Sequence, residues 1–312
     1  MTQTVTAPSL TRGEKLRTAL RDRWLYVMLI PGIIYYIIFV YIPMWGALFA
    51  FVDYSPAYGL FGSPWVGFKH FNRFFNSRQF SQLFSNTMVI SILNLVFYFP
   101  APILLALLLN EMRKEKYKRV LQSVMYLPHF MSAVIVVSMF QLIFSSEGGA
   151  INSILNALGF DSISFLTSKA WFRPILMIET IWKEVGWGTI IFMAALAGID
   201  PSLYEAAVVD GANHTQRLWH ITLPGIMPTI STLLILRMGS FLNTGFETIM
   251  LMQNSLNRSV SEVFDTYVYR VGITDAQYSY STAIGLFKSV IGLVLVYGSN
   301  KLAQKVGQEG IF

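Results

Sequence analysis

Six ionisable side chains interrupt long apolar stretches of the sequence, namely Glu179, Lys183, Glu184, Arg237, Glu247 and Lys288. Charges in such surroundings are expensive, and they usually face a polar cavity or one another. Glu179 and Lys183 share a helix face at i, i+4 spacing, so these two side chains could neutralise each other. Arg237 is the sharpest candidate for binding an acidic solute, because the fixed fork of an arginine suits a carboxylate. We therefore expect either a polar pathway or a set of interhelical salt bridges.

Motifs for catalysis, metal binding and nucleotide binding are missing. The sequence has no cysteine, which excludes thiolate metal sites and cysteine nucleophiles, and its four histidines form no His-Glu-x-x-His pair. It also lacks the Gly-x-x-x-x-Gly-Lys-Ser/Thr loop that cradles phosphates. The segment Gly186-Trp187-Gly188 starts like a dinucleotide fingerprint but lacks the third glycine. We expect a non-catalytic chain that holds no metal or cofactor of its own.

The composition is typical of a membrane protein. Of the 312 residues, 54% are hydrophobic and 13% are charged, which is about half of the usual charged share of a soluble domain. The formal net charge of +6 could suggest a nucleic-acid partner. The basic residues, however, gather at the ends of apolar runs instead of forming a solvated face with stacking aromatics. That placement indicates membrane topology and argues against nucleic acid.

Six apolar stretches are long enough to cross a bilayer as helices, for which about 20 residues suffice. The first holds 29 uncharged residues between Arg23 and Asp53. It is too long for the apolar core of a signal peptide, and no small-residue cleavage site follows, so we expect it to be retained. The sequence thus predicts an all-α integral membrane protein with six transmembrane helices, at 24–52, 79–110, 120–146, 174–199, 223–250 and 280–297.

Basic residues resist translocation and thereby orient the spans. With the N-terminus inside, the cytoplasmic segments carry 13 lysines and arginines and the outer loops carry 7. We therefore expect both termini in the cytoplasm, with a basic segment at 1–23, a transmembrane domain at 24–304 and a tail at 305–312. Leucines recur at roughly helical spacing within the basic segment. This pattern predicts either an interfacial helix on anionic membrane lipid or a solvated tail.

The loop at 200–224, which the charge count places inside, has the local chemistry of two short helices. Asp200 can cap a helix that has Pro201 at its first position, where the missing N–H costs nothing. Gly211 can supply the left-handed residue that ends this helix. Thr215 can cap a second helix, and Pro224 marks the entry to the next span. We expect a helix-turn-helix pair lying across the cytoplasmic face.

This loop resembles the EAA loop of ATP-binding-cassette (ABC) importer permeases, whose pattern is Glu-Ala-Ala, two residues, Asp-Gly-Ala, eight residues, then Ile-x-Leu-Pro. Every fixed position of the pattern is met, by Glu205, Ala206, Ala207, Asp210, Gly211, Ala212, Ile221, Leu223 and Pro224. Flanking segments resemble the oligosaccharide branch near the maltose-type permeases, and more narrowly the subfamily associated with pectic or uronate fragments. These segments are 183–189, 194–201, 246–247 and 285–302.

The resemblance implies the type I ABC importer permease fold and a place in a larger assembly. The partners it implies are a second homologous permease, two ABC ATPase subunits that bind ATP and Mg²⁺, and an extracytoplasmic solute-binding protein. The solute-binding protein would dock on the outer loops 53–83, 146–173 and 251–279. The implied location is the bacterial cytoplasmic membrane. Glu205 would pair with a basic group on the ATPase or brace the loop, while Asp210 and Gly211 would either serve docking or only shape the turn.

In such a permease the charged residues of the spans would border the path of an oligosaccharide. Arg237, Lys183 and Lys288 would meet its hydroxyls or carboxylates, and Trp182, Trp187 or Phe241 would stack on its apolar face. The alternatives are an importer of the same superfamily for an amino acid or phosphate, and a secondary transporter with Glu247 or Glu179 as its proton site. A membrane enzyme lacks support from any nucleophile–base pair or metal motif.

Overall fold

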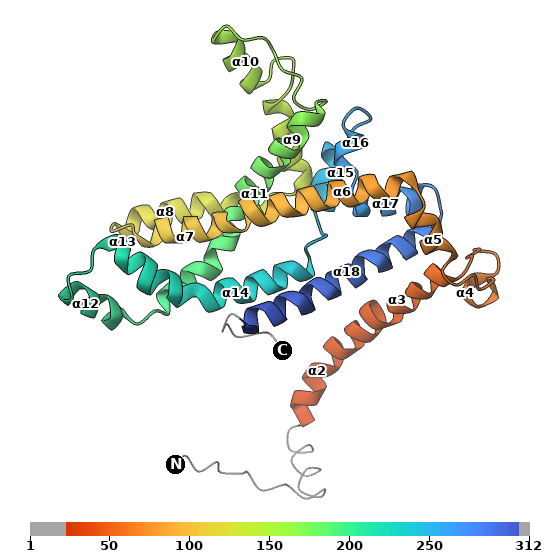
Figure 1. Cartoon of the computed structure of the whole chain (residues 1–312), viewed down its shortest axis with the longest axis horizontal. Coiled ribbons are helices and arrows are strands. Elements are labelled where there is room, and N and C mark those ends of the chain that lie inside the picture. Colours follow the sequence, from red (N-terminus) through yellow and green to blue (C-terminus); the bar gives the residue numbers. More distant parts are fainter. Residues whose placement is uncertain (1–22, 306–312) are drawn as a thin grey trace, which may run out of the picture.

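The structure, a computed structural model, describes residues 23–305 (Figure 1). The predicted interfacial helix in the N-terminal segment lies outside the described residues, as does the chain from 306 onward. Within 23–305 the regular elements are helical, apart from one isolated bridge between Val52 and Trp65. The helices, with 3-10 and π turns labelled η, are α2 (Arg23–Tyr36), η1 (Ile37–Tyr41), α3 (Ile42–Met44), η2 (Trp45–Phe51), α4 (Gly59–Gly62), α5 (Lys69–Phe75), α6 (Arg78–Leu93), η3 (Asn94–Tyr98), α7 (Pro100–Asn110), α8 (Glu115–Tyr126), η4 (Leu127–Phe130), α9 (Ala133–Ile143), α10 (Ala150–Ala157), α11 (Lys169–Ala197), α12 (Pro201–Val209), α13 (His214–Arg217), η5 (Leu218–Thr222), α14 (Leu223–Gly239), α15 (Phe246–Met252), α16 (Arg258–Ser261), α17 (Phe264–Tyr269), η6 (Arg270–Thr274) and α18 (Tyr278–Lys305).

Between four and six of the described helical segments have the length and apolar character of membrane spans. Four are continuous, namely Arg23–Phe51, Arg78–Asn110, His214–Gly239 and Tyr278–Lys305. Two more spans result if each of two bent helix pairs counts as one, namely Glu115–Phe130 with Ala133–Ile143 and Lys169–Ala197 with Pro201–Val209. The predicted all-helical membrane class is thereby confirmed, and six is the upper limit of the span count.

Two of the predicted spans are not single straight helices. The stretch at 120–146 bends by 102° after Phe130, where Pro128 sits in a 3-10 turn and Ser132 caps α9 by accepting a hydrogen bond from the backbone N–H of Ile135. The stretch at 223–250 stops at Gly239, and α15 begins only after an irregular segment. Length and mean hydropathy join the two sides of each break into one span, because each stretch as a whole is apolar.

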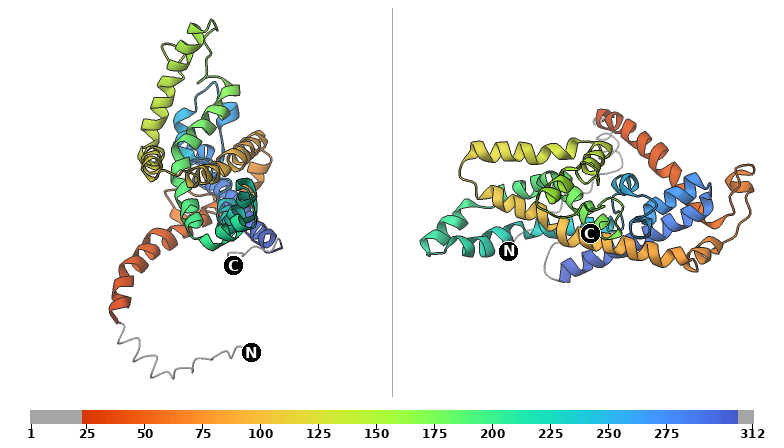
Figure 2. Two further views of the ribbon diagram at one scale, coloured as in Figure 1. Left: turned by 90° about the vertical axis from the view of Figure 1, so that its left-hand side faces the viewer. Right: turned by 90° about the horizontal axis from the view of Figure 1, so that it is seen from above.

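The helical body is built on α11, which crosses α7 and also contacts α14, α8 and α9 (Figures 1 and 2). The helices α11 and α7 approach closely at Gly188, where an added Cβ would lie 2.8 Å from the ring of Pro102. Buried side chains fill three clusters along the body. Two parts extend from it in opposite directions, the arm of α9 and α10 and the N-terminal helical segment (Figure 2).

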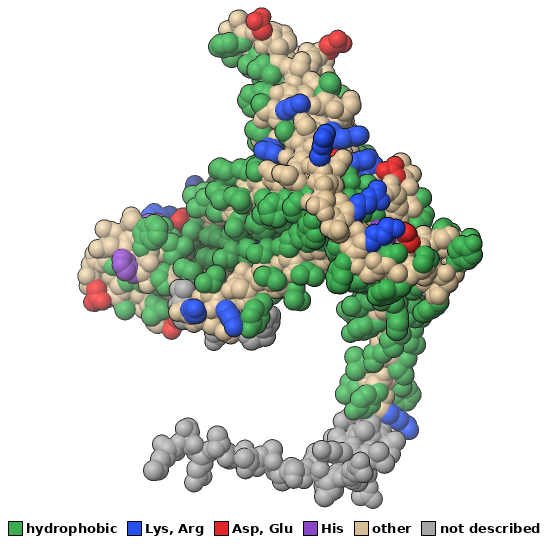
Figure 3. Space-filling model, turned by 45° about the vertical axis from the view of Figure 1, so that its right-hand side comes forward, with side chains coloured by type: hydrophobic (Ala, Val, Ile, Leu, Met, Phe, Trp, Pro, Cys, Tyr) green, Lys and Arg blue, Asp and Glu red, His purple; other side chains and the backbone are tan. Residues whose placement is uncertain are grey.

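The N-terminal segment Arg23–Phe51 exposes its apolar side chains along most of its length, and only its end at η2 packs against α18. Figure 3 shows the surface of this segment as mostly hydrophobic, and hydrophobic side chains also cover much of the helical body. A helix that is apolar on all sides requires lipid or other protein around it. The segment is therefore suited to span a lipid bilayer.

A polar network joins three parts of the chain around Asn86 of α6. The Asn86 amide donates to the carbonyl oxygens of Ser259 at 3.1 Å and Glu262 at 3.0 Å, and it accepts from Arg173 of α11 at 2.9 Å. Glu262 also accepts from Arg270 at 2.9 Å. Burial lowers the pKa of the Arg270 guanidinium, but the hydrogen bond and charge of Glu262 outweigh burial, so the net shift is upward.

We expect Asn86→Leu to destabilise the protein, because it removes three hydrogen bonds of a buried side chain, one of them to the buried Glu262. Each neutral bond contributes about 1 kcal/mol, and the bond from the arginine contributes more, so the loss is roughly 3 kcal/mol. The measurement is the thermal unfolding midpoint of the detergent-purified protein. Asn76→Ala serves as the control, since the exposed Asn76 side chain bonds only to Asn72. Equal midpoints for the two variants would contradict the role of the network.

Candidate functional site

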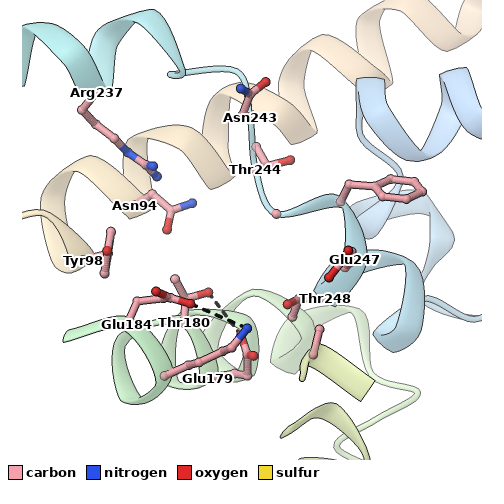
Figure 4. A pocket seen from close by; sticks show the side chains of 14 residues that line it. Asn94, Tyr98, Glu179, Thr180, Glu184, Arg237, Asn243, Thr244, Glu247 and Thr248 are labelled. Atoms are coloured by element: carbon pink, nitrogen blue, oxygen red, sulfur yellow. Dashed lines mark hydrogen bonds and ion pairs between the residues drawn. The ribbon is translucent and has the colours of Figure 1, made fainter. Parts of the chain in front are cut away.

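A cavity of about 560 Å³ lies where α11, α14, η3 and α15 converge (Figure 4). Its lining is mostly polar or charged and comprises Asn94, Tyr98, Ala133, Glu179, Thr180, Lys183, Glu184, Arg237, Asn243, Thr244, Gly245, Phe246, Glu247 and Thr248. In Figure 4, Arg237 and Asn94 lie on one side of an open space, and Glu179, Thr180 and Glu184 of α11 lie on the other. The volume falls within the usual range of small-molecule sites.

One wall of the cavity is irregular backbone. After α14 ends at Gly239 the chain continues without helix to Gly245, whose φ of 90° is left-handed, and then enters α15. Non-helical backbone at membrane depth is tolerated where it is buried in protein or lines a cavity. The break is what brings Asn243 and Thr244 to the cavity and what separates Glu247 from the helix that carries Arg237.

Three buried polar atoms of the lining lack a hydrogen-bond partner among the described residues. They are the side-chain oxygens Asn94 Oδ1, Glu179 Oε1 and Thr244 Oγ1, on residues that are 3%, 1% and 5% exposed. Buried polar side chains are hydrogen-bonded in the large majority of cases. Their grouping around one cavity indicates that solvent or a polar ligand completes their hydrogen bonds.

The cations of the cavity are weakly compensated. Lys183 Nζ lies 3.6 Å from Glu184 Oε1, beyond ordinary hydrogen-bond length. The Arg237 guanidinium lies over the ring of Tyr98, 5.6 Å from its centroid, and takes part in no ion pair with the described residues. Among the described residues, Glu179 forms no ion pair with Lys183. The i, i+4 spacing of these two residues therefore does not produce the salt bridge that the sequence suggested. Two cationic groups thus remain able to interact with a ligand.

The structure brings five of the predicted pathway residues to the cavity, namely Glu179, Lys183, Glu184, Arg237 and Glu247. The other predicted residues, Trp182 among them, lie elsewhere. The ring of Trp187 stacks on His129, with centroids 4.5 Å apart. Phe241 is buried and its carbonyl oxygen accepts from the Ser91 hydroxyl, while Lys288 pairs with Asp265.

Sequence reasoning missed the neutral polar part of the lining, above all Asn94, Thr244 and Thr248. A signal for Asn94 was present, because an asparagine in the middle of the apolar stretch 79–110 requires a partner. The Thr-Gly pair at 244–245 in the stretch 223–250 is a break signal of the same kind. Charged residues drew attention because a charge is the larger cost, yet the neutral groups complete the site.

The loop at 200–224 folds as two short capped helices, largely as expected. The Asp200 carboxylate accepts from the backbone N–H of Ser202 at 2.9 Å, and Gly211 ends α12 with a φ of 78°. Pro224 lies in the first turn of α14. The predicted cap at Thr215 is wrong, because Asn213 caps α13 in a reciprocal capping box with Gln216. That box satisfies two N–H groups, whereas a Thr215 cap would leave Asn213 unused.

Side-chain contacts hold the loop at 200–224 in a fixed conformation. The Tyr204 hydroxyl lies 3.0 Å from the Thr222 hydroxyl and joins α12 to η5. His214 Nε2 lies 2.6 Å from Glu111 Oε2, which ties the loop to the turn between α7 and α8. The outer side of α12 remains exposed, with Val208 at 55% and Val209 at 87%. The loop therefore presents an apolar and acidic surface on a fixed support.

An all-helical body with interrupted spans around a polar cavity defines a component of a membrane transport system. The chain belongs to the family of inner membrane components of binding-protein-dependent transport systems, whose sequence pattern matches residues 98–308. Members of this family are non-catalytic permease subunits of ABC transporters. Family membership confirms the expected class and confirms that the chain is not an enzyme.

Curated relatives and solved structures match nearly the whole chain. It is 55% identical to Protein LplB of Bacillus subtilis (strain 168), over 98% of this chain and 97% of that protein. It is 50% identical to the polygalacturonan/rhamnogalacturonan transport system permease protein YteP of the same organism, over 96% of this chain and 94% of that protein. The crystal structure of a bacterial ABC transporter involved in the import of the acidic polysaccharide alginate matches with a TM-score of 0.87 and 42% identity, covering 93% of this chain and 98% of that one. The type I importer permease fold is thereby confirmed.

Proposed function

We propose that the chain is one of two permease subunits of an ABC importer for acidic, uronate-containing oligosaccharides, and that its cavity forms half of the translocation pathway. One observation supports this proposal most strongly. A single cavity contains two cations without a close acidic partner and three buried polar atoms without a hydrogen-bond partner among the described residues. Arg237 and Lys183 supply positive charge, while Asn94 and Thr244 supply neutral hydrogen-bonding groups. A uronate oligosaccharide carries both kinds of complementary group, carboxylates and hydroxyls.

The relatives support the acidic class of cargo. YteP is named for polygalacturonan and rhamnogalacturonan transport, and the matching solved transporter imports alginate, described as an acidic polysaccharide. Arg237 suits a carboxylate because a guanidinium presents two parallel N–H donors to both oxygens. Amino acids and phosphate are also anionic, but they offer few hydroxyls for Asn94 and Thr244. A proton-coupled carrier is disfavoured because the family works with a binding protein and belongs to ABC transporters.

The loop at 200–224 is proposed as the coupling element to the ATPase subunits, which bind ATP and Mg²⁺. A force-transmitting element needs a rigid, capped structure on the moving core. The caps of α12 and α13, the Gly211 turn and the tie from His214 to Glu111 meet that need. The exposed Val208 and Val209 fit an apolar cleft, with Glu205 and Asp210 beside them for basic groups.

The remaining partners follow from this assignment. With the coupling loop inside, the segment 1–23 and the tail 305–312 lie on the cytoplasmic side of the bacterial membrane. The outer loops 53–83, 146–173 and 251–279 then face a solute-binding protein, a partner for which the alginate transporter provides a precedent in its complex with a pentasaccharide-bound periplasmic protein. In the loop 53–83, a hydrogen bond from Lys69 at 2.6 Å holds the pKa of Asp53 below its usual value.

We expect ATP hydrolysis by the complete reconstituted importer to rise when its solute-binding protein carries an oligogalacturonide. The binding protein loaded with a neutral oligosaccharide of the same length should stimulate hydrolysis less. The measurement is the rate of phosphate release at saturating binding protein, with unloaded binding protein as the control. Stimulation by an amino acid or by phosphate, and none by any oligosaccharide, would refute the proposed cargo while leaving the permease class intact.

A further inference from the structure

His129 lies in η4, at the bend between α8 and α9, and contacts Glu184, a residue of the cavity lining. Its ring nitrogen Nδ1 is 2.7 Å from Glu184 Oε2. Because a carboxylate only accepts hydrogen bonds, Nδ1 carries the proton and donates it to Glu184. The imidazole also stacks on Trp187 with an interplanar angle of 6°. The side chains of His129 and Glu184 are 27% and 28% exposed, so their contact is largely shielded from solvent.

The backbone around His129 is held in place against α11. An added Cβ at Gly186 would lie 1.9 Å from the carbonyl oxygen of Met125, so the end of α8 rests directly on the backbone of α11. Phe130 meets Trp187 edge to face, with ring centroids 6.0 Å apart. These contacts leave the imidazole little freedom to follow Glu184 if that carboxylate turns. The hydrogen bond therefore determines the position of the carboxylate and not the reverse.

Glu184 divides its two oxygens between a close and a distant partner. Oε2 bonds to His129 at 2.7 Å, whereas Oε1 lies 3.6 Å from the ammonium of Lys183. Without the bond to His129, the carboxylate could turn toward Lys183 and close that gap to a charge-assisted hydrogen bond of about 2.8 Å. Such a compact pair would neutralise one of the two cavity cations that lack a close acidic partner among the described residues.

We propose that His129 is a positioning residue for the translocation pathway, which holds Glu184 back so that the ammonium of Lys183 stays available to a carboxylate of the cargo. This inference rests on the proposed acidic cargo, because a neutral sugar would gain little from the charge of an ammonium that has only a distant acidic partner. It also gives a reason for the stacked pair of His129 and Trp187 beside the cavity. Trp187 acts here by orienting the imidazole.

The test compares uptake of an oligogalacturonide with uptake of its methyl-esterified, uncharged counterpart by the complete importer in proteoliposomes. His129→Phe keeps an aromatic ring against Trp187 but removes the N–H donor. We expect the acidic-to-neutral uptake ratio to fall about tenfold, the effect of losing one charge-assisted hydrogen bond. His129→Asn retains a donor near the position of Nδ1, and we expect it to restore most of the ratio.

The double variant His129→Phe with Glu184→Gln tests the mechanism itself. Glutamine carries no charge that could neutralise Lys183, so the ratio should return toward the wild-type value. A ratio that stays low in the double variant, or equal losses for both cargoes in His129→Phe, would overturn the positioning role. The ratio cancels differences in the amount of assembled importer, and His129→Leu provides a second donor-free variant if the phenylalanine variant does not assemble.

Arg237→Met separates failure of this inference from failure of the proposed function. If Arg237→Met and His129→Phe both leave the acidic-to-neutral ratio unchanged, neither cavity cation reads the charge of the cargo and the acidic assignment fails. If Arg237→Met lowers the ratio but His129→Phe does not, the acidic assignment stands and only the role of His129 fails.

Discussion

Arg237→Met is expected to lower uptake of an acidic oligosaccharide by about ten- to a hundredfold, because the cavity loses a bidentate, charge-assisted contact of roughly 1.5–3 kcal/mol. Arg237 has no ion pair among the described residues that would offset this loss. Methionine keeps an unbranched apolar stem in place of the arginine methylenes, so α14 should pack as before. The measurement is the initial uptake rate of a labelled oligogalacturonide by proteoliposomes that contain the complete importer.

The control for this substitution is Arg113→Met. Arg113 is an exposed residue of the turn between α7 and α8 and lies outside the cavity lining. We expect Arg113→Met to leave the uptake rate within about twofold of wild type, as for most exposed substitutions. Unchanged acidic uptake in a folded, fully assembled Arg237→Met importer would refute the role of this arginine.

Gly211→Pro is expected to remove the ATPase from the complex. The backbone of Gly211 has a φ of 78° and donates a hydrogen bond to the carbonyl oxygen of Val208 at 3.1 Å. Proline is restricted to a φ near −65° and has no N–H, so the turn between α12 and α13 cannot form. We expect at least a tenfold loss of co-purified ATPase, since disrupting the turn costs about 3 kcal/mol or more.

The matched control at the same position is Gly211→Asn, because asparagine tolerates the left-handed conformation and retains the backbone N–H. Assembly should then remain close to wild type. The measurement is the ratio of ATPase to permease after affinity purification, together with ATP-driven uptake. If Gly211→Pro retained both assembly and uptake, the loop at 200–224 would not be the coupling element.

The helical class and the local fold of the loop at 200–224 were predictable because both depend on local features. Spans follow from runs of about 20 apolar residues, and the cap at Asp200 and the turn at Gly211 follow from neighbours within a few residues. The misplaced cap at Thr215 was a local error. The pattern of Asn213 with Gln216 three residues later is itself the signature of a capping box, and it could have been recognised.

The breaks within spans depend on packing as well as on local signals such as Pro128 and the Thr-Gly pair at 244–245, so length and hydropathy alone missed them. Pro128 lies in an apolar stretch that hydropathy alone joins into one span, yet the chain bends there by 102°. The end of α14 at Gly239 coincides with a close approach to α18, where an added Cβ would lie 2.8 Å from Val296. The sequence shows the small residue but not the helix that faces it.

By itself the sequence determined the membrane class, the approximate spans and the local form of the loop at 200–224, because each depends on residues near one another in the chain. Only the tertiary structure decided which charges meet. It paired Lys288 with Asp265, set His129 between Glu184 and Trp187, and left Arg237 facing a cavity. The physical reason is that helical spacing specifies which side chains share a face, whereas the crossing of separate helices specifies what that face meets.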